Sequence, residues 1–247
     1  MRLIIKFNKK EKIRYAQQQL QGFIYSLLNK AGYSSFHDIH QKLPRFFNFS
    51  QLFLGKDGYL TLVISSPIND LIKSLFKSIN KKEIFRIAND FLEILAVSFY
   101  DYYLSSNKQI IKIKTETPIV VRIPREKYDD YLLPQNFSKY PYFYWRPLKG
   151  VPFEPFVKQL EARIYKEYKL FAGKANIKEF PIFYTFRYIK TLDVPFFEKG
   201  KKISRPGTMW EFTLNPALNK KLTKFIIDTG LGELNSQGYG FVNVVQK

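Results

Sequence analysis

The sequence predicts an α+β protein, and three observations support this class. Some segments repeat apolar residues at spacings of three and four, as a helix with one buried face does. Short apolar runs near turn residues lie between those segments and are typical of strands. In the first hundred residues the predicted order is strand, helix, strand, strand, helix, strand, which is the ferredoxin-like order. The second half again mixes both kinds of segment, without a convincing repeat at the level of single residues.

A polar, tyrosine-rich stretch at residues 101–109 is the expected boundary between two domains. It predicts an N-terminal domain over residues 1–105 and a C-terminal domain over residues 106–247. The 247 residues are enough for one large domain or two of ordinary size.

The first elements follow from apolar spacing and from residues that begin or end helices. Residues 1–7 predict a strand, and residues 12–31 predict a helix that Gly32 ends. Residues 34–42 predict a short second helix, because serines cap its start and Pro44 stops it.

Two strands, a helix and a further strand complete the first half. Residues 46–54 and 59–65 predict strands, and the Lys-Asp-Gly sequence between them is a hairpin signal. Residues 67–80 predict a helix with proline at its start. Residues 83–99 contain the fourth strand, although their apolar spacing also fits a helix.

The second half opens with a predicted strand at residues 117–123, which carries Arg122. A helix is predicted at residues 154–172, because aromatic and aliphatic residues recur along one side of it. Strands are predicted at residues 180–190 and 210–214, with a basic hairpin or loop between them.

A helix at residues 216–229, a glycine-rich loop and a strand at residues 241–245 follow. Residues 140–146, with the sequence Tyr-Pro-Tyr-Phe-Tyr-Trp-Arg, place an aromatic cluster beside a cation. This cluster fits either a platform on which bases stack or the packing between two domains, and we favour the packing.

The composition favours a polyanionic partner. Forty Lys and Arg residues against 21 Asp and Glu residues give a formal charge of +19, which favours RNA, DNA or an anionic membrane face. Many of the 24 Phe and 17 Tyr residues belong in a core, but aromatics among basic residues also suit nucleic acid. The absence of cysteine and the presence of only two histidines exclude a zinc deaminase, and we expect no metal or other cofactor.

The first residues do not read as a secretory signal, because the apolar run is short and lysines follow at once. No stretch reaches the roughly 18 uncharged apolar residues of a membrane span. We therefore expect a cytoplasmic protein without a membrane partner.

Four of the 12 glycines fall within residues 230–240. The predicted order of helix, glycine loop and strand argues against a dinucleotide fingerprint, and the Gly-Lys-Ser/Thr of a phosphate-binding loop is absent. Two interpretations remain. The loop is either a ring of backbone N–H groups that cradles a phosphate chain, or a tight turn without a ligand.

The segment from Tyr25 to Arg45 holds the groups that metal-free RNA cleavage needs. In this reaction the ribose 2′-OH attacks the adjacent phosphate, and one group takes its proton while another protonates the leaving 5′ oxygen. His37 and His40 suit these transfers because the unperturbed pKa of histidine is about 6.5. Lys42 and Arg45 can stabilise the developing charge. The alternative for either histidine is a side chain without a catalytic role.

Three stretches carry a resemblance to a known family. They are residues 20–25 (Leu-Gln-Gly-Phe-Ile-Tyr), residues 39–50 around His40 and Pro44, and the terminal Gly-x-Gly-Glu-x-Asn-Ser-x-Gly-Tyr-Gly-Phe. The sequence resembles the CRISPR-associated endoribonucleases that cut precursor repeat RNA, which are members of the RAMP superfamily. The resemblance implies two tandem ferredoxin-like (βαββαβ) domains with a C-terminal glycine-rich loop. It also implies a metal-independent endoribonuclease that makes mature guide RNAs with 2′,3′-cyclic phosphate and 5′-hydroxyl ends.

The resemblance places the family's catalytic residues in the first half. Its tyrosine falls on Tyr25 and its histidine on His40, whereas Arg45 stands where the family has a catalytic lysine after the proline. Arginine differs from lysine in geometry, so Lys42 stays an alternative cation. His37 stays a catalytic candidate, because some relatives use two histidines close together here.

The resemblance also implies RNA contacts at the glycine loop and at the cleft between the domains. The residues expected to bind RNA are Lys42, Arg122, Gly230, Gly232, Asn235, Ser236, Gln237, Gly238 and Gly240.

The implied partners are precursor and mature CRISPR repeat RNA, with other CRISPR effector subunits as further candidates. Both a monomer and a homodimer are compatible with the sequence. One alternative function is a non-catalytic RAMP subunit that binds repeat RNA in an effector complex, and another is an unrelated RNA-binding α+β protein. The presence of His40 favours the ribonuclease.

Overall fold

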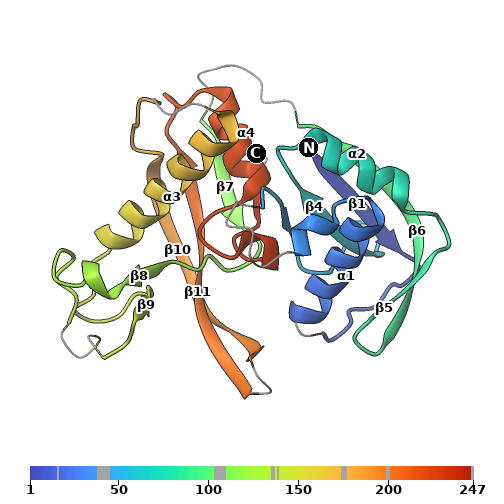
Figure 1. Cartoon of the computed structure of the whole chain (residues 1–247), viewed down its shortest axis with the longest axis horizontal. Coiled ribbons are helices and arrows are strands. Elements are labelled where there is room, and N and C mark those ends of the chain that lie inside the picture. The colour runs from blue at the N-terminus through green and yellow to red at the C-terminus, as the bar shows by residue number, and fades with distance from the viewer. Residues whose placement is uncertain are drawn as a thin grey trace.

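The computed structural model describes residues 1–15, 17–37, 45–102, 110–134, 137, 139–173, 177–198 and 201–245. Within these ranges the chain forms a mixed α+β structure with one large antiparallel sheet in each half and two α-helices beside each sheet (Figure 1). We call residues 1–102 the N-terminal half and residues 110–245 the C-terminal half.

The sheet of the N-terminal half has the strand order β2-β4-β1-β6-β5, and β3 also pairs with β4. Its strands are β1 (Arg2–Phe7), β2 (Asn48–Phe49), β3 (Phe53–Leu54), β4 (Leu60–Ser65), β5 (Ile84–Ile87) and β6 (Asp90–Tyr100). Two helices, α1 (Gln17–Lys30) and α2 (Asn69–Ser78), share a buried apolar core with these strands. A short 3₁₀ turn, η1 (Ser34–His37), follows α1.

The sheet of the C-terminal half has the strand order β10-β11-β7-β12. Its strands are β7 (Lys112–Thr115), β10 (Phe183–Glu198), β11 (Lys201–Leu214) and β12 (Val242–Val244). Its helices are α3 (Glu154–Ala172) and α4 (Lys220–Thr229), and a separate ribbon pairs β8 (Arg122–Pro124) with β9 (Tyr142–Tyr144). The long hairpin of β10 and β11 projects below the rest of this half in Figure 1. Two 3₁₀ turns, η2 (Arg125–Lys127) and η4 (Asn235–Gln237), lie in connecting segments.

Several predicted elements are confirmed, some of them with different limits. Helix α3 has the predicted limits, and the glycine loop does lie between a helix and a strand. The first helix is described from Gln17 onward, and Tyr15 lies outside it, with its hydroxyl accepting the N–H of Leu52 at 2.8 Å. Residues 83–99 form a hairpin of two strands rather than one strand.

The strand predicted at residues 117–123 is wrong except at its end, where Arg122 and Ile123 belong to β8. The sheet strand is β7, a few residues earlier, and Ile119 and Val120 make only isolated bridges, to Thr208 and Glu233. Pro118 interrupts a continuous ladder because proline has no N–H to donate.

The aromatic cluster at residues 140–146 does not pack between the halves as we favoured. Phe143 and Trp145 belong to the core of the C-terminal half, where Trp145 contacts the rings of Phe156 and Trp210. Tyr140 and Tyr142 are exposed.

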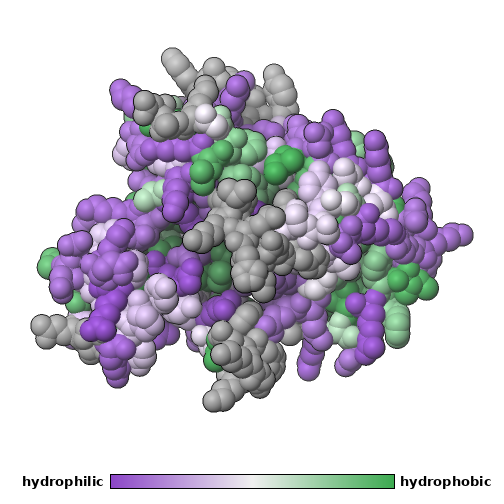
Figure 2. All heavy atoms as spheres, viewed as in Figure 1, coloured by the Kyte–Doolittle hydropathy of each residue, from purple (hydrophilic) through white to green (hydrophobic). Residues whose placement is uncertain are grey.

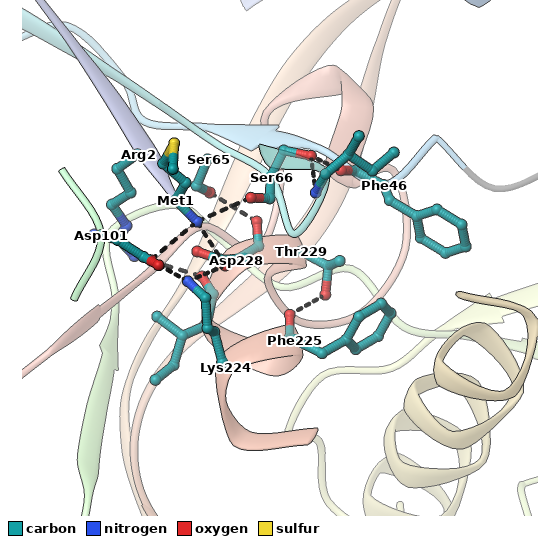
Figure 3. Close-up of polar contacts among 12 residues, drawn as sticks. Met1, Arg2, Phe46, Ser65, Ser66, Asp101, Lys224, Phe225, Asp228 and Thr229 are labelled. Carbon is teal, nitrogen blue, oxygen red and sulfur yellow. Dashed lines mark hydrogen bonds and ion pairs between the residues drawn. The ribbon is translucent and has the colours of Figure 1, made fainter. Parts of the chain in front are cut away.

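The two halves meet in a polar interface centred on Asp228 of α4 (Figure 3). This carboxylate is fully buried and lies 2.8 Å from the α-amino group of Met1 and 2.9 Å from the ammonium group of Lys224. The Ser65 hydroxyl donates to the Asp228 carbonyl at 2.8 Å. These contacts join β1 and β4 to α4, so they help to set the relative position of the two sheets.

Among the described residues, none of the helices combines the length and the apolarity that crossing a bilayer requires.

Candidate functional site

A polar cavity of about 230 Å³ lies between the two halves, next to the glycine loop. The N-terminal half contributes Arg45 and Phe46, which precede β2. The C-terminal half contributes side chains from β8, α3 and the loop after α4. The described lining residues are Arg45, Phe46, Arg122, Arg163, Glu167, Thr229, Glu233, Leu234, Asn235, Ser236 and Gln237.

Arg45 is held at this cavity by Tyr25 of α1. The guanidinium of Arg45 donates to the Tyr25 hydroxyl at 2.6 Å, and it also lies over the tyrosine ring, 5.5 Å from its centroid. The Tyr25 ring is 6% exposed and packs edge-on against Phe47. The buried tyrosine therefore suits positioning of the arginine more than direct contact with a ligand.

The structure describes only one of the two histidines, His37, and only its backbone. His37 is the last residue of η1, and its backbone is described. His40 and Lys42 lie outside the described residues, within the segment that joins η1 to Arg45. The part of the site that can be built from geometry is therefore the pair Tyr25 and Arg45 together with the glycine loop.

The glycine loop packs so closely against the N-terminal half that side chains would not fit. Gly238 has φ of +84°, and a Cβ atom there would lie 2.1 Å from the Gln17 amide nitrogen and 2.5 Å from the Phe49 ring. The Gln17 and Asn48 amides both donate to loop carbonyls, at 3.0 Å to Gln237 and 2.8 Å to Tyr239. The glycine density therefore has a packing function in addition to any ligand contact.

Several amides of the expected phosphate cradle already have partners within the protein. The N–H groups of Gln237 and Gly238 donate to carbonyls of the same loop, both at 2.8 Å. Those of Gly230 and Gly240 donate to the carbonyls of Ile226 and Pro118. These bonds do not use the amides of Asn235 and Ser236, and both residues line the cavity. Of the residues expected to form the cradle, Asn235 and Ser236 are therefore those that line the cavity and whose backbone amides these bonds leave out.

Three charged residues at the cavity were not predicted from the sequence. Arg163 and Glu167 lie one turn apart on α3, and Glu233 follows the second glycine of the loop. The first two resemble any surface ion pair of a helix in the sequence, so no local signal marks them. Glu233 is the glutamate of the glycine signature and was the one recognisable residue of the three.

A second groove, of about 780 Å³, lies between the N-terminal half and the β10–β11 hairpin. Lys12, Arg14 and Tyr15 line it from the segment before α1, and Phe53 and Pro195 line it from β3 and the hairpin. Figure 2 shows hydrophilic residues over most of the visible face, with apolar side chains in separate groups. Within the described ranges, no three histidine or acidic side chains come together in a way that would hold a metal ion.

The fold and the cavity together define the class of this protein: an α+β protein with a polar, arginine-lined cavity between its two halves. A sequence profile described as "CRISPR associated protein Cas6, C-terminal" matches residues 101–244, more than half of the chain. The chain belongs to this family. The resemblance to CRISPR-associated repeat-processing endoribonucleases is therefore confirmed.

Individual relatives agree with this assignment. The chain is 27% identical over 246 residues to "CRISPR-associated endoribonuclease Cas6 2" of Methanocaldococcus jannaschii, and the match covers 92% of this chain and 91% of the relative. A solved structure described as "Characterization of a Cas6-related gene from Pyrococcus furiosus" superposes with a TM-score of 0.70 at 19% identity, covering 100% and 99% of the two chains. Another, described as "An RAMP protein binding different RNA substrates", gives a TM-score of 0.67 at 19% identity and covers both chains completely. These two similarities show the fold.

Proposed function

We propose that this protein cleaves CRISPR repeat RNA within precursor transcripts and so produces mature guide RNAs. The observation that carries the proposal is the meeting of Arg45, held by Tyr25, with the glycine loop in one polar cavity. Family membership and the names of the curated relatives support the same activity. A formal charge of +19 supports a polyanionic substrate.

The proposed reaction is a transesterification that needs no metal ion. The 2′-OH beside the scissile phosphate attacks the phosphorus, and the bond to the 5′ oxygen of the next nucleotide breaks. His40 or His37 takes the 2′ proton or supplies the proton to the leaving oxygen. Arg45 stabilises the extra negative charge on the phosphorane. The products carry a 2′,3′-cyclic phosphate and a 5′-hydroxyl.

The proposed domains are residues 1–105 and 106–247, both ferredoxin-like. The strand orders support this assignment: β6-β1-β4-β2 in one sheet and β12-β7-β11-β10 in the other. In each, the first strand of the half lies between the last strand and the third, as in a ferredoxin-like sheet. The two apolar cores are likewise built from residues of one half each, apart from a few partly buried contacts.

The proposed RNA path also uses the larger groove. Lys12 and Arg14 supply charge for phosphates there, and Tyr15 and the 41%-exposed Phe53 supply rings beside them. Binding of repeat RNA should therefore weaken steeply with added salt.

The test is cleavage of the repeat RNA from the source genome, with and without EDTA, followed by analysis of the product ends. We expect cleavage in EDTA and 2′,3′-cyclic phosphate ends. His40→Ala should slow cleavage by roughly 10²- to 10⁴-fold while RNA affinity stays nearly unchanged. Binding of repeat RNA without any cleavage would refute this function and identify the non-catalytic RAMP alternative. Equal rates for parent and variant would remove His40 from the mechanism.

A further inference from the structure

Four of the five charged side chains that the structure describes at the cavity form two separate ion pairs. Glu233 of the glycine loop binds Arg122 of β8, and Glu167 binds Arg163 one turn away on α3. Each glutamate is more buried than its arginine: Glu233 and Glu167 side chains are 14% and 16% exposed, and both arginines are 36% exposed. Burying a carboxylate is unfavourable unless it is paired. Each glutamate therefore depends on its arginine, and each pair is expected to keep a fixed geometry.

Glu233 fixes Arg122 in one orientation. One carboxylate oxygen accepts the backbone N–H of Arg122 at 2.9 Å, and the other contacts Nε and Nη2 of its guanidinium. The Tyr142 ring lies against the face of the same guanidinium, 5.2 Å from it. These contacts leave the Nη1 side of Arg122 for another acceptor. A planar guanidinium fixed in this way is preorganised for an oxyanion.

Arg163 has an unused donor in the same place. Glu167 accepts from its Nη2 at 2.6 Å, whereas its Nε is buried and has no acceptor among the described residues. A buried donor without a partner is unfavourable, so Glu167 alone does not satisfy Arg163, whose 36%-exposed side chain lines the cavity.

The balance of charge indicates what kind of ligand fits. The described residues that line the cavity include three arginines and two glutamates, so one positive charge is left uncompensated. One RNA phosphodiester carries one negative charge and would neutralise it. Burial raises the pKa of Glu167, the repulsion from Glu233 raises it further, and Arg163 opposes both. Both carboxylates line the same cavity.

We propose that Glu233 and Glu167 are positioning residues, which hold Arg122 and Arg163 as a clamp for the RNA phosphodiester next to the scissile one. This inference rests on the proposed function, because it assigns a second phosphate contact beside Arg45. The glutamates act through the arginines and do not touch the RNA themselves. They also offset two of the three arginine charges at the cavity, which leaves one positive charge for one phosphodiester.

The test is a mutant cycle on Glu233 and Arg122, read by single-turnover cleavage of repeat RNA at saturating protein. Glu233→Gln should slow cleavage roughly tenfold, and the double variant with Arg122→Ala should be no slower than Arg122→Ala alone. Glu154→Gln is the matched control. It removes the same charge from the exposed Glu154–Lys158 ion pair of α3 and should leave the rate unchanged.

The second readout is the salt dependence of RNA binding, which does not require cleavage. Loss of one phosphate contact should make the negative slope of log K against log salt less steep by about 0.7 to 0.9, in Glu233→Gln as in Arg122→Ala. Simple removal of negative charge would instead tighten binding and leave the slope unchanged. Glu167→Gln with Arg163→Ala repeats the cycle on α3, where the result does not depend on folding of the glycine loop.

The outcomes distinguish the proposed clamp from the proposed cleavage function. Additive losses in both cycles, or glutamate variants that match Glu154→Gln, would overturn the clamp even if the parent cleaves RNA. A parent that binds repeat RNA without cutting it would refute the cleavage function, and the salt slopes would still decide on the clamp. A parent that binds no RNA would overturn both.

Discussion

Gly240→Ala tests the conclusion that the glycine loop is shaped by packing against its own surroundings. A Cβ atom at Gly240 would lie 1.8 Å from the carbonyl oxygen of Leu231, and the residue has φ of +66°. Gly173, at the end of α3, is the matched control, because it has φ of +63° and nothing within 4 Å of an added Cβ. The control variant carries the backbone strain without the clash.

The expected loss of folding free energy follows from the backbone strain and the steric clash. Left-handed backbone at a non-glycine residue costs about 1–2 kcal/mol, which is the whole expected effect of Gly173→Ala. Overpacking against a rigid neighbour adds about 1–3 kcal/mol, so Gly240→Ala should lose about 2–5 kcal/mol. Leu231 offers no flexible end that could move away, because the clash is with its backbone carbonyl.

Two assays measure this prediction. Thermal unfolding should show a melting temperature that falls by about 2–4 °C for each kcal/mol lost, and therefore further for Gly240→Ala than for the control. Cleavage of repeat RNA should fall at least tenfold only in Gly240→Ala, since a shift of about 1 Å in a positioning loop can cost about 10²-fold. Equal melting temperatures for the two variants, with parental cleavage in both, would refute the packing argument.

Three further predictions follow from the contacts of single side chains. Tyr25→Phe removes the hydroxyl that accepts from Arg45, and should cost about 0.5–1.5 kcal/mol in urea unfolding while slowing cleavage less than Arg45→Ala does. If Tyr25→Phe is as slow as His40→Ala, the tyrosine has a direct catalytic role instead. Asp228→Asn removes the fully buried carboxylate that pairs with the Met1 amine and the half-buried Lys224, and should cost about 3 kcal/mol, the low end for a buried pair, because both cations still contact Asp101; unchanged thermal unfolding would show that this interface does not hold the halves together. The pKa of Glu167 is raised in the folded protein, mainly by burial, so its contribution to stability is present below its ordinary pKa of 4.5 and is lost as pH rises through the raised value. The stability of the parent should thus fall relative to Glu167→Gln over that window in urea titrations at successive pH values, and a constant difference would contradict the assignment.

Local sequence patterns were sufficient to predict the elements that depend mainly on their own residues. The apolar face of α3 and the glycines that follow α4 were both recognised in the sequence, and the structure confirms them. Residues 117–121 were misassigned because their backbone partners lie far away in the sequence. The bridges of Ile119 to β11 and of Val120 to the glycine loop exist only once the half has folded.

The candidate site likewise contains some residues that the sequence indicated and others that only the structure brings together. Tyr25 and Arg45 were recognised through motifs, and the structure brings them together by a hydrogen bond of 2.6 Å. Arg163 and Glu167 were missed because an i,i+4 ion pair on a helix is ordinary in sequence and usually contributes little. Only the approach of α3 to the glycine loop places this pair beside Glu233 and the cavity.

The central claim is that the scissile region of the RNA lies in the cavity between Arg45 and the glycine loop. A crystal structure with repeat RNA that carries a 2′-deoxy nucleotide at the cleavage position would test it most directly. We expect the uncleaved phosphate within hydrogen-bond distance of the Arg45 guanidinium, and the neighbouring phosphate against Arg122 and Arg163. An RNA that passes through the larger groove while its scissile phosphate lies away from Arg45 would contradict the account.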